Sequence, residues 1–263
     1  GSGSAGAVVA RRLVDAGATV LLIEAGKLEA SEAVHEPSRL FELWDSAEDW
    51  GYRTVPQAGG GGRELHWPRG KVLGGSSGLN GMIWVRGHRL DYDGWAAAGN
   101  PGWDFDSMLA LFKRAEDFDR GADAYRGTGG PVRVISEYER HPLIESALEA
   151  AVETGIPFND DYNGAELEGV GFVQLTIRDG RRDSTASAYL GPVLGNPGLT
   201  VAGESHATRL LFEGDRCVGV EYVSGGAVET AHARHEVVVS AGTIESPKLL
   251  MLSGIGRADE LAR

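Results

Sequence analysis

The sequence predicts a mixed α/β fold, and three observations support this prediction. The chain opens with GSGSAG, a glycine pattern that is typical of the tight turn between a strand and a helix. The next residues, AVVARRLVDAG, have helical periodicity, and the following VLLIEAG is an apolar run typical of a buried parallel strand. Segments of both types then recur to the end of the chain without an internal repeat.

Length and charge limit the classes of function. A chain of 263 residues can form one large domain or two smaller ones. Its formal net charge of −13 argues against nucleic acid or an anionic membrane as a partner. No apolar run approaches the ~20 residues that cross a bilayer, so we expect no transmembrane segment. We see no signal peptide and expect a cytoplasmic protein, although the chain does not begin with Met.

The remaining elements follow from local periodicity. We expect helices over 104–118, with Asp106 as the capping residue, over 141–155 and over 243–254. Strands are expected over 131–136 and over 171–180, where alternation would bring Val173, Leu175 and Ile177 to one face. Short strands separated by turns, from about 199 to 240, resemble a small meander.

The opening glycines have the spacing of a dinucleotide-binding turn. Gly1 would permit the tight turn, Gly3 would let the backbone approach a pyrophosphate, and Gly6 would let helix and strand pack closely. The N–H groups at the start of the following helix would face the phosphates. We therefore expect the whole turn to hold the cofactor: Gly1, Ser2, Gly3, Ser4, Ala5 and Gly6.

Glu24 strengthens this interpretation. It follows Gly6 by eighteen residues, at the end of the next predicted strand, where an acid would bind ribose hydroxyls. The alternative is an exposed acid at a strand end. An acid here favours an adenosine with a free 2′-hydroxyl, hence NAD or FAD over NADP, and the glycine motif does not separate these two.

Two longer stretches carry a family resemblance. GKVLGGSSGLNGMIWVRGHRLDYD, residues 70–93, and GTIESPKLLMLSGIG, residues 242–256, resemble the two signature segments of the glucose-methanol-choline (GMC) family of flavin oxidoreductases. Connecting segments such as DYDGWAAAGNPGWDF and GRRDSTASAYLGPV are similar to that family as well. The similarity is closest to its choline dehydrogenase-like members. The resemblance spans nearly the entire chain.

The resemblance implies a Rossmann-like FAD-binding domain and a flavin that accepts a hydride at N5 from the CH–OH group of a small-molecule alcohol. The alcohol and the electron acceptor (oxygen, a quinone or another carrier) stay open. Besides the opening turn, the implied FAD-binding residues are Glu24, Ala25, Val72, Gly74, Gly75, Asn80, Gly81, Met82, Ile83, Ala207, Ala241 and Gly242.

The resemblance also bears on how the flavin is attached. Some family members bind it covalently through a histidine directly before the asparagine of the first signature. Leu79 occupies that position here, and leucine cannot form such a bond. We therefore expect FAD to be held non-covalently.

No catalytic or metal-binding residue is assigned. In the family the catalytic histidine lies in the second half of the chain, whereas this sequence has about half the usual family length. The seven histidines present have no metal-ligand spacing on a predicted helix: His35, His66, His88, His141, His206, His232 and His235. The single cysteine, Cys217, excludes an internal disulfide. We expect an internal piece of a longer flavoenzyme, from which the strand before Gly1 is also absent.

The resemblance implies a discontinuous architecture. We expect an FAD-binding domain over 1–130 and 181–263, with its parallel sheet and a β-meander, and the first segment of an α+β substrate-binding domain over 131–180. The expected function is the FAD-binding half of an FAD-dependent alcohol oxidoreductase, inactive on its own. Two alternatives remain, namely a hydroxynitrile lyase-type member and an inactive FAD-binding remnant.

Overall fold

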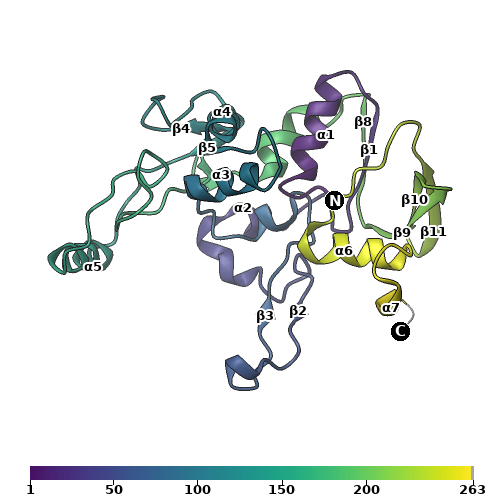
Figure 1. Ribbon diagram of the computed structural model, residues 1–263, viewed down its shortest axis with the longest axis horizontal. Coiled ribbons are helices and arrows are strands. Elements are labelled where there is room, and N and C mark those ends of the chain that lie inside the picture. Colours follow the sequence, from purple (N-terminus) through teal and green to yellow (C-terminus); the bar gives the residue numbers. More distant parts are fainter. Residues whose placement is uncertain (262–263) are drawn as a thin grey trace. The chain divides into compact units, whose positions relative to one another are not determined.

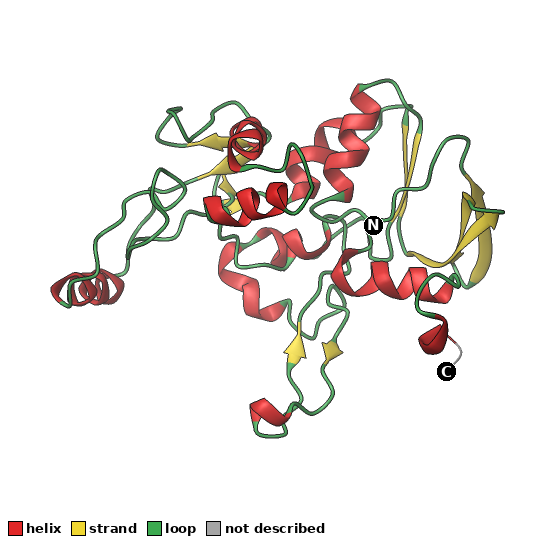
Figure 2. Ribbon diagram, viewed as in Figure 1, coloured by secondary structure: helices red, strands yellow, loops and turns green. Residues whose placement is uncertain are grey.

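The computed structural model describes residues 1–261, with the backbone alone for Glu260 (Figure 1). The chain forms two compact units. The first consists of Gly1–Asn80 and Ser184–Arg263, and the second of Gly81–Asp183. The mixed α/β fold expected from the sequence is confirmed, because helices and parallel strand pairs occur together (Figure 2).

The first unit begins with the expected turn, helix and strand. Helix α1 (Gly6–Asp15) is followed by β1 (Val20–Ile23), which pairs in parallel with β8 (Leu199–Ala202). Gly17 follows the helix end and adopts a left-handed conformation with φ of 82°, which an L side chain rarely adopts. Glu24 follows β1 directly and lies beside the opening turn, where its carboxylate accepts the Ser2 N–H at 2.8 Å.

The predicted meander is confirmed. Strands β9 (Ser205–Glu213), β10 (Arg216–Ser224) and β11 (Ala227–His232) form an antiparallel sheet with β10 in the centre. The predicted last helix is α6 (Gly242–Leu252), followed by α7 (Ala258–Leu261). The Ser253 hydroxyl at the end of α6 accepts the Leu210 N–H at 2.8 Å, so this helix is fastened to β9.

Short elements surround the second glycine run of the first unit. They are α2 (Glu32–His35), η1 (Pro37–Glu42), β2 (Tyr52–Arg53), η2 (Ala58–Gly60), β3 (His66–Trp67), η3 (Gly75–Gly78), the π-helix η4 (Ala186–Leu190) and η5 (Gly191–Val193). Ala33, Val34, Leu43, Val72 and Leu79 form a buried apolar cluster there. The glycine run is thus anchored on both sides of its glycines, by Val72 and by Leu79.

The second unit contains α3 (Arg89–Ala97), α4 (Phe105–Ala115), α5 (Pro142–Glu153) and two strand pairs. Strand β4 (Glu116–Phe118) pairs in parallel with β5 (Val132–Val134), and β6 (Ile177–Arg178) pairs antiparallel with β7 (Arg181–Arg182). The cap predicted for α4 was wrong. Asp104 is the N-cap, because its carboxylate accepts the Ser107 N–H at 2.9 Å, whereas Asp106 lies in the first turn.

The interior of the second unit is unusually polar. The side chains of Glu116 and Arg126 are both 0% exposed, and Arg126 Nη2 lies 3.0 Å from Glu116 Oε2. Arg86 reaches the other oxygen of Glu116 at 2.7 Å, and Gln174 accepts from Arg126 Nη1 at 2.8 Å. The strand predicted over 171–180 differs from the structure in two ways. Gln174 is buried in this polar network whereas Val173 is exposed. Within this segment only Ile177–Arg178 form a regular strand.

Helix α5 forms where the sequence predicts it but has no buried residue. Figure 2 shows this helix flanked on both sides by loops.

None of the described helices is long and apolar enough to cross a membrane.

Candidate functional site

The opening turn folds tightly onto itself. A Cβ on Gly6 would lie 1.8 Å from the Gly1 carbonyl oxygen, and a Cβ on Gly1 would lie 2.6 Å from the carbonyl oxygen of Ser240. Only glycine fits at these two positions. Gly3 differs, because a Cβ there would meet a single atom, the Gly75 Cα, at the ordinary contact distance of 3.8 Å. The backbone at Gly3 is therefore open to an approaching group.

The start of α1 lies directly behind this turn. Its N-cap residue, Ala5, provides no side-chain hydrogen bond to the helix, and the first turn holds no acidic residue. Unsatisfied N–H groups at a helix N-terminus attract anions, and the helix dipole adds to the attraction. The side chains of Ser4 and Ala5 are exposed. The turn and the helix start can together accept a phosphate group.

The second glycine run packs against the first. Gly74 and Gly75 have φ of 96° and 53°, and a Cβ on Gly75 would lie 2.8 Å from Gly3 Cα. A Cβ on Gly74 would lie 3.1 Å from the Ala186 Cβ. Val72 is fully buried beside them. The structure thus brings Val72, Gly74 and Gly75 close to the opening turn, although they lie some seventy residues further along the chain. The predicted site requires this proximity.

Glu24 is buried between these segments with 5% of its surface exposed. Its Oε2 accepts the Ser2 N–H at 2.8 Å and the Ser2 hydroxyl at 2.7 Å, and its Oε1 accepts the Gly26 N–H at 2.9 Å. An ionised carboxylate has about four lone-pair positions, so one acceptor position remains, on Oε1. A ribose hydroxyl is the kind of donor that this position can take.

A pocket of about 300 Å³ opens directly after Glu24. Its lining includes Ala25, one of the predicted site residues, and His206, the neighbour of the predicted Ala207. The full set is Ala25, Gly26, Lys27, Ala47, Lys71, Glu204, His206, Val223, Gly225 and Gly226. Its position beside Glu24 suits the base of an adenosine whose ribose that acid would bind.

Aromatic side chains contact two residues that line this pocket, His206 and Lys71. The rings of Trp50 and His206 are 5.3 Å apart, and Lys71 Nζ lies 4.9 Å from the Trp50 ring. Trp50 also stacks on Tyr52, whose hydroxyl donates to Glu245. Burial, together with the neighbouring Glu245 carboxylate, raises the pKa of the Tyr52 hydroxyl, so it remains protonated and a donor at neutral pH. These contacts are not predictable from the sequence, because no local pattern links segments so far apart.

The remaining predicted residues are distributed over both units. Ala241 caps α6, and its Cα would lie 3.2 Å from a Cβ on Gly1, so Ala241 and Gly242 adjoin the opening turn. Ala207 pairs with Tyr222 within the meander. The Asn80 N–H donates to the Ser76 carbonyl at 2.9 Å at the end of the second glycine run.

Gly81, Met82 and Ile83 belong to the second unit. The Met82 carbonyl accepts the Thr176 N–H at 2.8 Å, and Met82 has φ of 60°, which is uncommon for a non-glycine residue. Ile83 is exposed, and Tyr162 and Asn163 both donate to the next residue's carbonyl, that of Trp84, at 3.0 Å. The second unit therefore holds this strained segment by hydrogen bonds to its backbone.

A segment that sequence analysis did not assign to the site completes the second glycine run. The Ser77 hydroxyl donates to the Gly74 carbonyl at 2.6 Å and accepts the Thr185 N–H at 3.0 Å. Gly74 therefore lies against the residues around Thr185, more than one hundred positions further along the chain. These hydrogen bonds fix the left-handed turn at Gly74 and Gly75.

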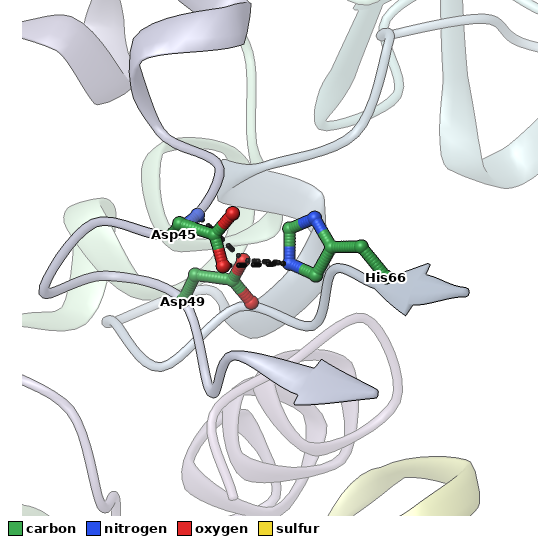
Figure 3. A group of neighbouring side chains, drawn as sticks. All are labelled: Asp45, Asp49 and His66. Atoms are coloured by element: carbon green, nitrogen blue, oxygen red, sulfur yellow. Dashed lines mark hydrogen bonds and ion pairs between the residues drawn. The ribbon is translucent and has the colours of Figure 1, made fainter. Parts of the chain in front are cut away.

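Asp45, Asp49 and His66 form a separate group near the β2–β3 hairpin (Figure 3). His66 Nε2 lies 3.0 Å from Asp49 Oδ2 and 3.4 Å from Asp45 Oδ1. The Asp49 carboxylate also accepts the backbone N–H groups of Asp45, Gly51 and Arg69, and Asp45 pairs with Arg53 at 2.9 Å. The carboxylate oxygens are already occupied by protein donors, so we interpret this group as an anchor of the loop.

The fold and the site together define a dinucleotide-binding protein, with a glycine turn, a helix start for phosphate and a buried acid at a strand end. The family model described as "GMC oxidoreductase" matches residues 1–263. The chain therefore belongs to the GMC oxidoreductases, and the resemblance expected from the sequence is confirmed.

Curated relatives match over nearly the full chain. Mitochondrial choline dehydrogenase of Homo sapiens is 46% identical over 100% of this chain and 46% of its own length. Oxygen-dependent choline dehydrogenase of Brucella anthropi is 44% identical over 99% of this chain and 48% of its own length. The chain thus spans about half the length of these relatives.

Solved structures share the fold. Pyridoxine 4-oxidase from "Mesorbium loti" superposes with a TM-score of 0.95 at 39% identity, over 100% of this chain and 52% of that chain. Formate oxidase of Aspergillus oryzae superposes with a TM-score of 0.91 at 32% identity, over 100% of this chain and 48% of that chain.

Proposed function

We propose that this chain is the FAD-binding part of an oxidoreductase that oxidises the CH–OH group of a small alcohol. The contact between the two glycine turns beside the buried Glu24 is the observation that carries the proposal. A Cβ on Gly3 would meet only the Gly75 Cα, at 3.8 Å, so the backbone at Gly3 is open, whereas Gly1 and Gly6 are tightly packed. A turn of this kind, followed by a helix start without a side-chain cap, suits a pyrophosphate.

Each part of FAD has candidate residues in the chain. The opening turn and the start of α1 would hold the pyrophosphate, Glu24 the ribose, and the pocket beside Ala25 the adenine. Ala207, Ala241 and Gly242 would support the adenine end and the turn. The residues proposed to lie along the flavin are Val72, Gly74, Gly75, Asn80, Gly81, Met82 and Ile83.

FAD supplies, when bound, an acceptor for the hydride that leaves the carbon of the substrate's CH–OH group. The described residues bind and orient that acceptor, and we assign none of them as the base that takes the hydroxyl proton. Relatives that are named choline dehydrogenases favour a choline-like alcohol as substrate. We assign no electron acceptor.

We further propose that FAD binds without a covalent bond at the position where some family members carry one. Leu79 occupies that position, and its side chain is 4% exposed within the apolar cluster of the first unit. An aliphatic side chain packed in this way has no atom that can form a bond to flavin.

The roles of the two units are part of the proposal. We keep the predicted assignment of FAD binding to residues 1–130 and 181–263 and of the first substrate-binding segment to residues 131–180. The compact units divide the chain differently, because the second unit runs from Gly81 to Asp183. The expected cytoplasmic location also stays a prediction, since one relative is named as mitochondrial.

Flavin retention tests the proposal. The chain is mixed with FAD, desalted, and examined for flavin absorbance, with Glu24→Gln as the matched variant. We expect the wild-type chain to retain flavin and the variant to bind it about tenfold more weakly, the loss typical of a charge-assisted hydrogen bond. A folded wild-type chain that emerges colourless would contradict the proposal.

A measurement on a longer parent protein would distinguish an alcohol oxidoreductase from a hydroxynitrile lyase. An alcohol oxidoreductase reduces and bleaches its flavin when alcohol is added without oxygen, whereas a hydroxynitrile lyase leaves the flavin oxidised. Retention of flavin by a parent with neither activity would indicate an FAD-binding remnant.

A further inference from the structure

We propose that Ser2 is a positioning residue that sets the selectivity of the site for a ribose 2′-hydroxyl. The inference rests on the proposed function, because it concerns how Glu24 receives the ribose of an adenine nucleotide. Ser2 is the residue between the first two glycines of the turn, and its side chain is fully buried. It therefore acts through neighbouring protein groups rather than by touching the cofactor with its hydroxyl.

The direction of the Ser2 hydroxyl proton follows from its neighbours. The Gly74 N–H donates to Ser2 Oγ at 3.1 Å, and Glu24 Oε2 lies 2.7 Å on the other side. A carboxylate accepts hydrogen bonds and an N–H group only donates, so the hydroxyl accepts from Gly74 and donates to Glu24. The Ser2 side chain thereby links the second glycine run to the ribose-binding acid.

This arrangement makes the two carboxylate oxygens of Glu24 unequal. Oε2 receives both the N–H and the hydroxyl of Ser2, which fills its two lone-pair positions. Oε1 receives only the Gly26 N–H at 2.9 Å. The ribose hydroxyl is left with one acceptor, in a fixed direction. Without the Ser2 hydroxyl the carboxylate has a second open position, and the buried Gly74 N–H loses its partner.

Binding of ADP and 2′-deoxy-ADP tests this role. Isothermal titration of the wild-type chain should show ADP binding about tenfold more tightly than 2′-deoxy-ADP. In Ser2→Ala we expect weaker ADP binding, because the Ser2 hydroxyl no longer holds the Glu24 carboxylate in place. The preference for ADP over 2′-deoxy-ADP, measured as the ratio of their dissociation constants, should shrink about threefold or more. In Glu24→Gln the same Ser2 substitution should produce no further change in the ratio, since Ser2 acts through Glu24.

Ser205→Ala is the matched control. Ser205 is also a buried serine of the first unit, but its hydroxyl contacts Gly203 and Ser224 instead of the Glu24 carboxylate. Its loss should leave the ADP to 2′-deoxy-ADP ratio unchanged. If Ser2→Ala does not fold by circular dichroism, Ser2→Cys fills the space with a weaker donor and should show the same loss of ratio.

The outcomes separate the inference from the proposed function. A wild-type chain that is folded but binds neither FAD nor ADP overturns both. A wild-type chain that binds FAD, while Ser2→Ala weakens ADP and 2′-deoxy-ADP equally or not at all, overturns only the role of Ser2. A ratio that falls in Ser2→Ala, but that the same Ser2 substitution does not change further in the Glu24→Gln background, supports it.

Discussion

Gly75 lies directly against Gly3, with so little space between them that a Cβ on Gly75 would come within 2.8 Å of the Gly3 Cα. The backbones of two glycine turns that are far apart in the sequence are therefore in direct contact. This contact fixes the Gly3 backbone on one side and leaves the other side open, which is the property that a phosphate-binding turn needs.

Substitution of Gly3 by Ala should abolish flavin binding without unfolding the chain. The new methyl group would meet only Gly75 Cα, at 3.8 Å, and the Gly3 φ is not in the left-handed region. The methyl group would stand where we place the pyrophosphate. We expect native-like circular dichroism and loss of flavin absorbance after desalting.

Gly6→Ala is the contrasting variant. Its Cβ would overlap the Gly1 carbonyl oxygen at 1.8 Å, so the turn itself must open. We expect a loss of stability of about 1–3 kcal/mol, the usual cost of overpacking. Retention of flavin by Gly3→Ala, or equal destabilisation by both variants, would show that Gly3 does not face the phosphates.

Acid precipitation should separate the flavin from the protein. Leu79 packs in the apolar cluster and has no group that can bond to flavin. After treatment with trichloroacetic acid, we expect the flavin absorbance in the supernatant and a colourless pellet. A yellow pellet would mean that another residue forms the covalent bond.

The polar interior of the second unit should depend strongly on Glu116. Glu116→Gln removes the one carboxylate shared by the buried Arg86 and Arg126 side chains. Breaking a buried ion pair typically costs about 3–5 kcal/mol, because a charge is left without its partner. Urea unfolding should show this loss. Asp106→Asn is the control, since Asp106 pairs with Arg89 in solvent with 77% of its side chain exposed, and we expect a change below about 1 kcal/mol.

Asp49 should make the first unit sensitive to acid. Burial alone would raise the pKa of Asp49, but N–H donors from Asp45, Arg69 and Gly51, with His66, outweigh it and lower the pKa. A carboxyl with a lowered pKa in the folded state stabilises the fold above its unfolded pKa of about 3.9, and this contribution is lost as the pH falls through the folded value.

The free energy of unfolding should therefore fall more steeply below about pH 4 in the wild-type chain than in Asp49→Asn. Urea midpoints measured between pH 6 and pH 3 give both slopes. Parallel curves for the two proteins would rule out a contribution from Asp49.

Local sequence patterns predicted the elements that carry their own signals. The glycine turn, α1, β1 and the meander formed where predicted because glycine spacing and periodicity are local, although β1 is not the buried strand expected, since Leu21 is exposed and only Leu22 is buried. The burial of Gln174 was not predictable, since the partners that satisfy its side chain, such as Arg126 and Asn163, come from other segments. For the same reason nothing local indicated that residues near Thr185 would hold Gly74.

The capping error at α4 has a local cause. Asp104 and Asp106 are both acids near the helix start, and the sequence does not specify which backbone N–H each would meet. The structure shows Asp104 in the extended conformation that a cap requires, with φ of −63° and ψ of 159°. The true cap, Asp104, therefore lies two residues before the predicted cap, Asp106.

Helix α5 determines where the chain should be cut first. Its twelve residues bury no side chain, and Leu143 is 70% exposed. A helix of this length without tertiary packing is only marginally stable in water, so its amide protons should exchange with deuterium faster than those of α1. Limited digestion by a protease that prefers aliphatic residues should then nick the chain between Leu143 and Val152. The glycine turns and Glu24 should remain intact in the N-terminal piece, which is the heavier of the two.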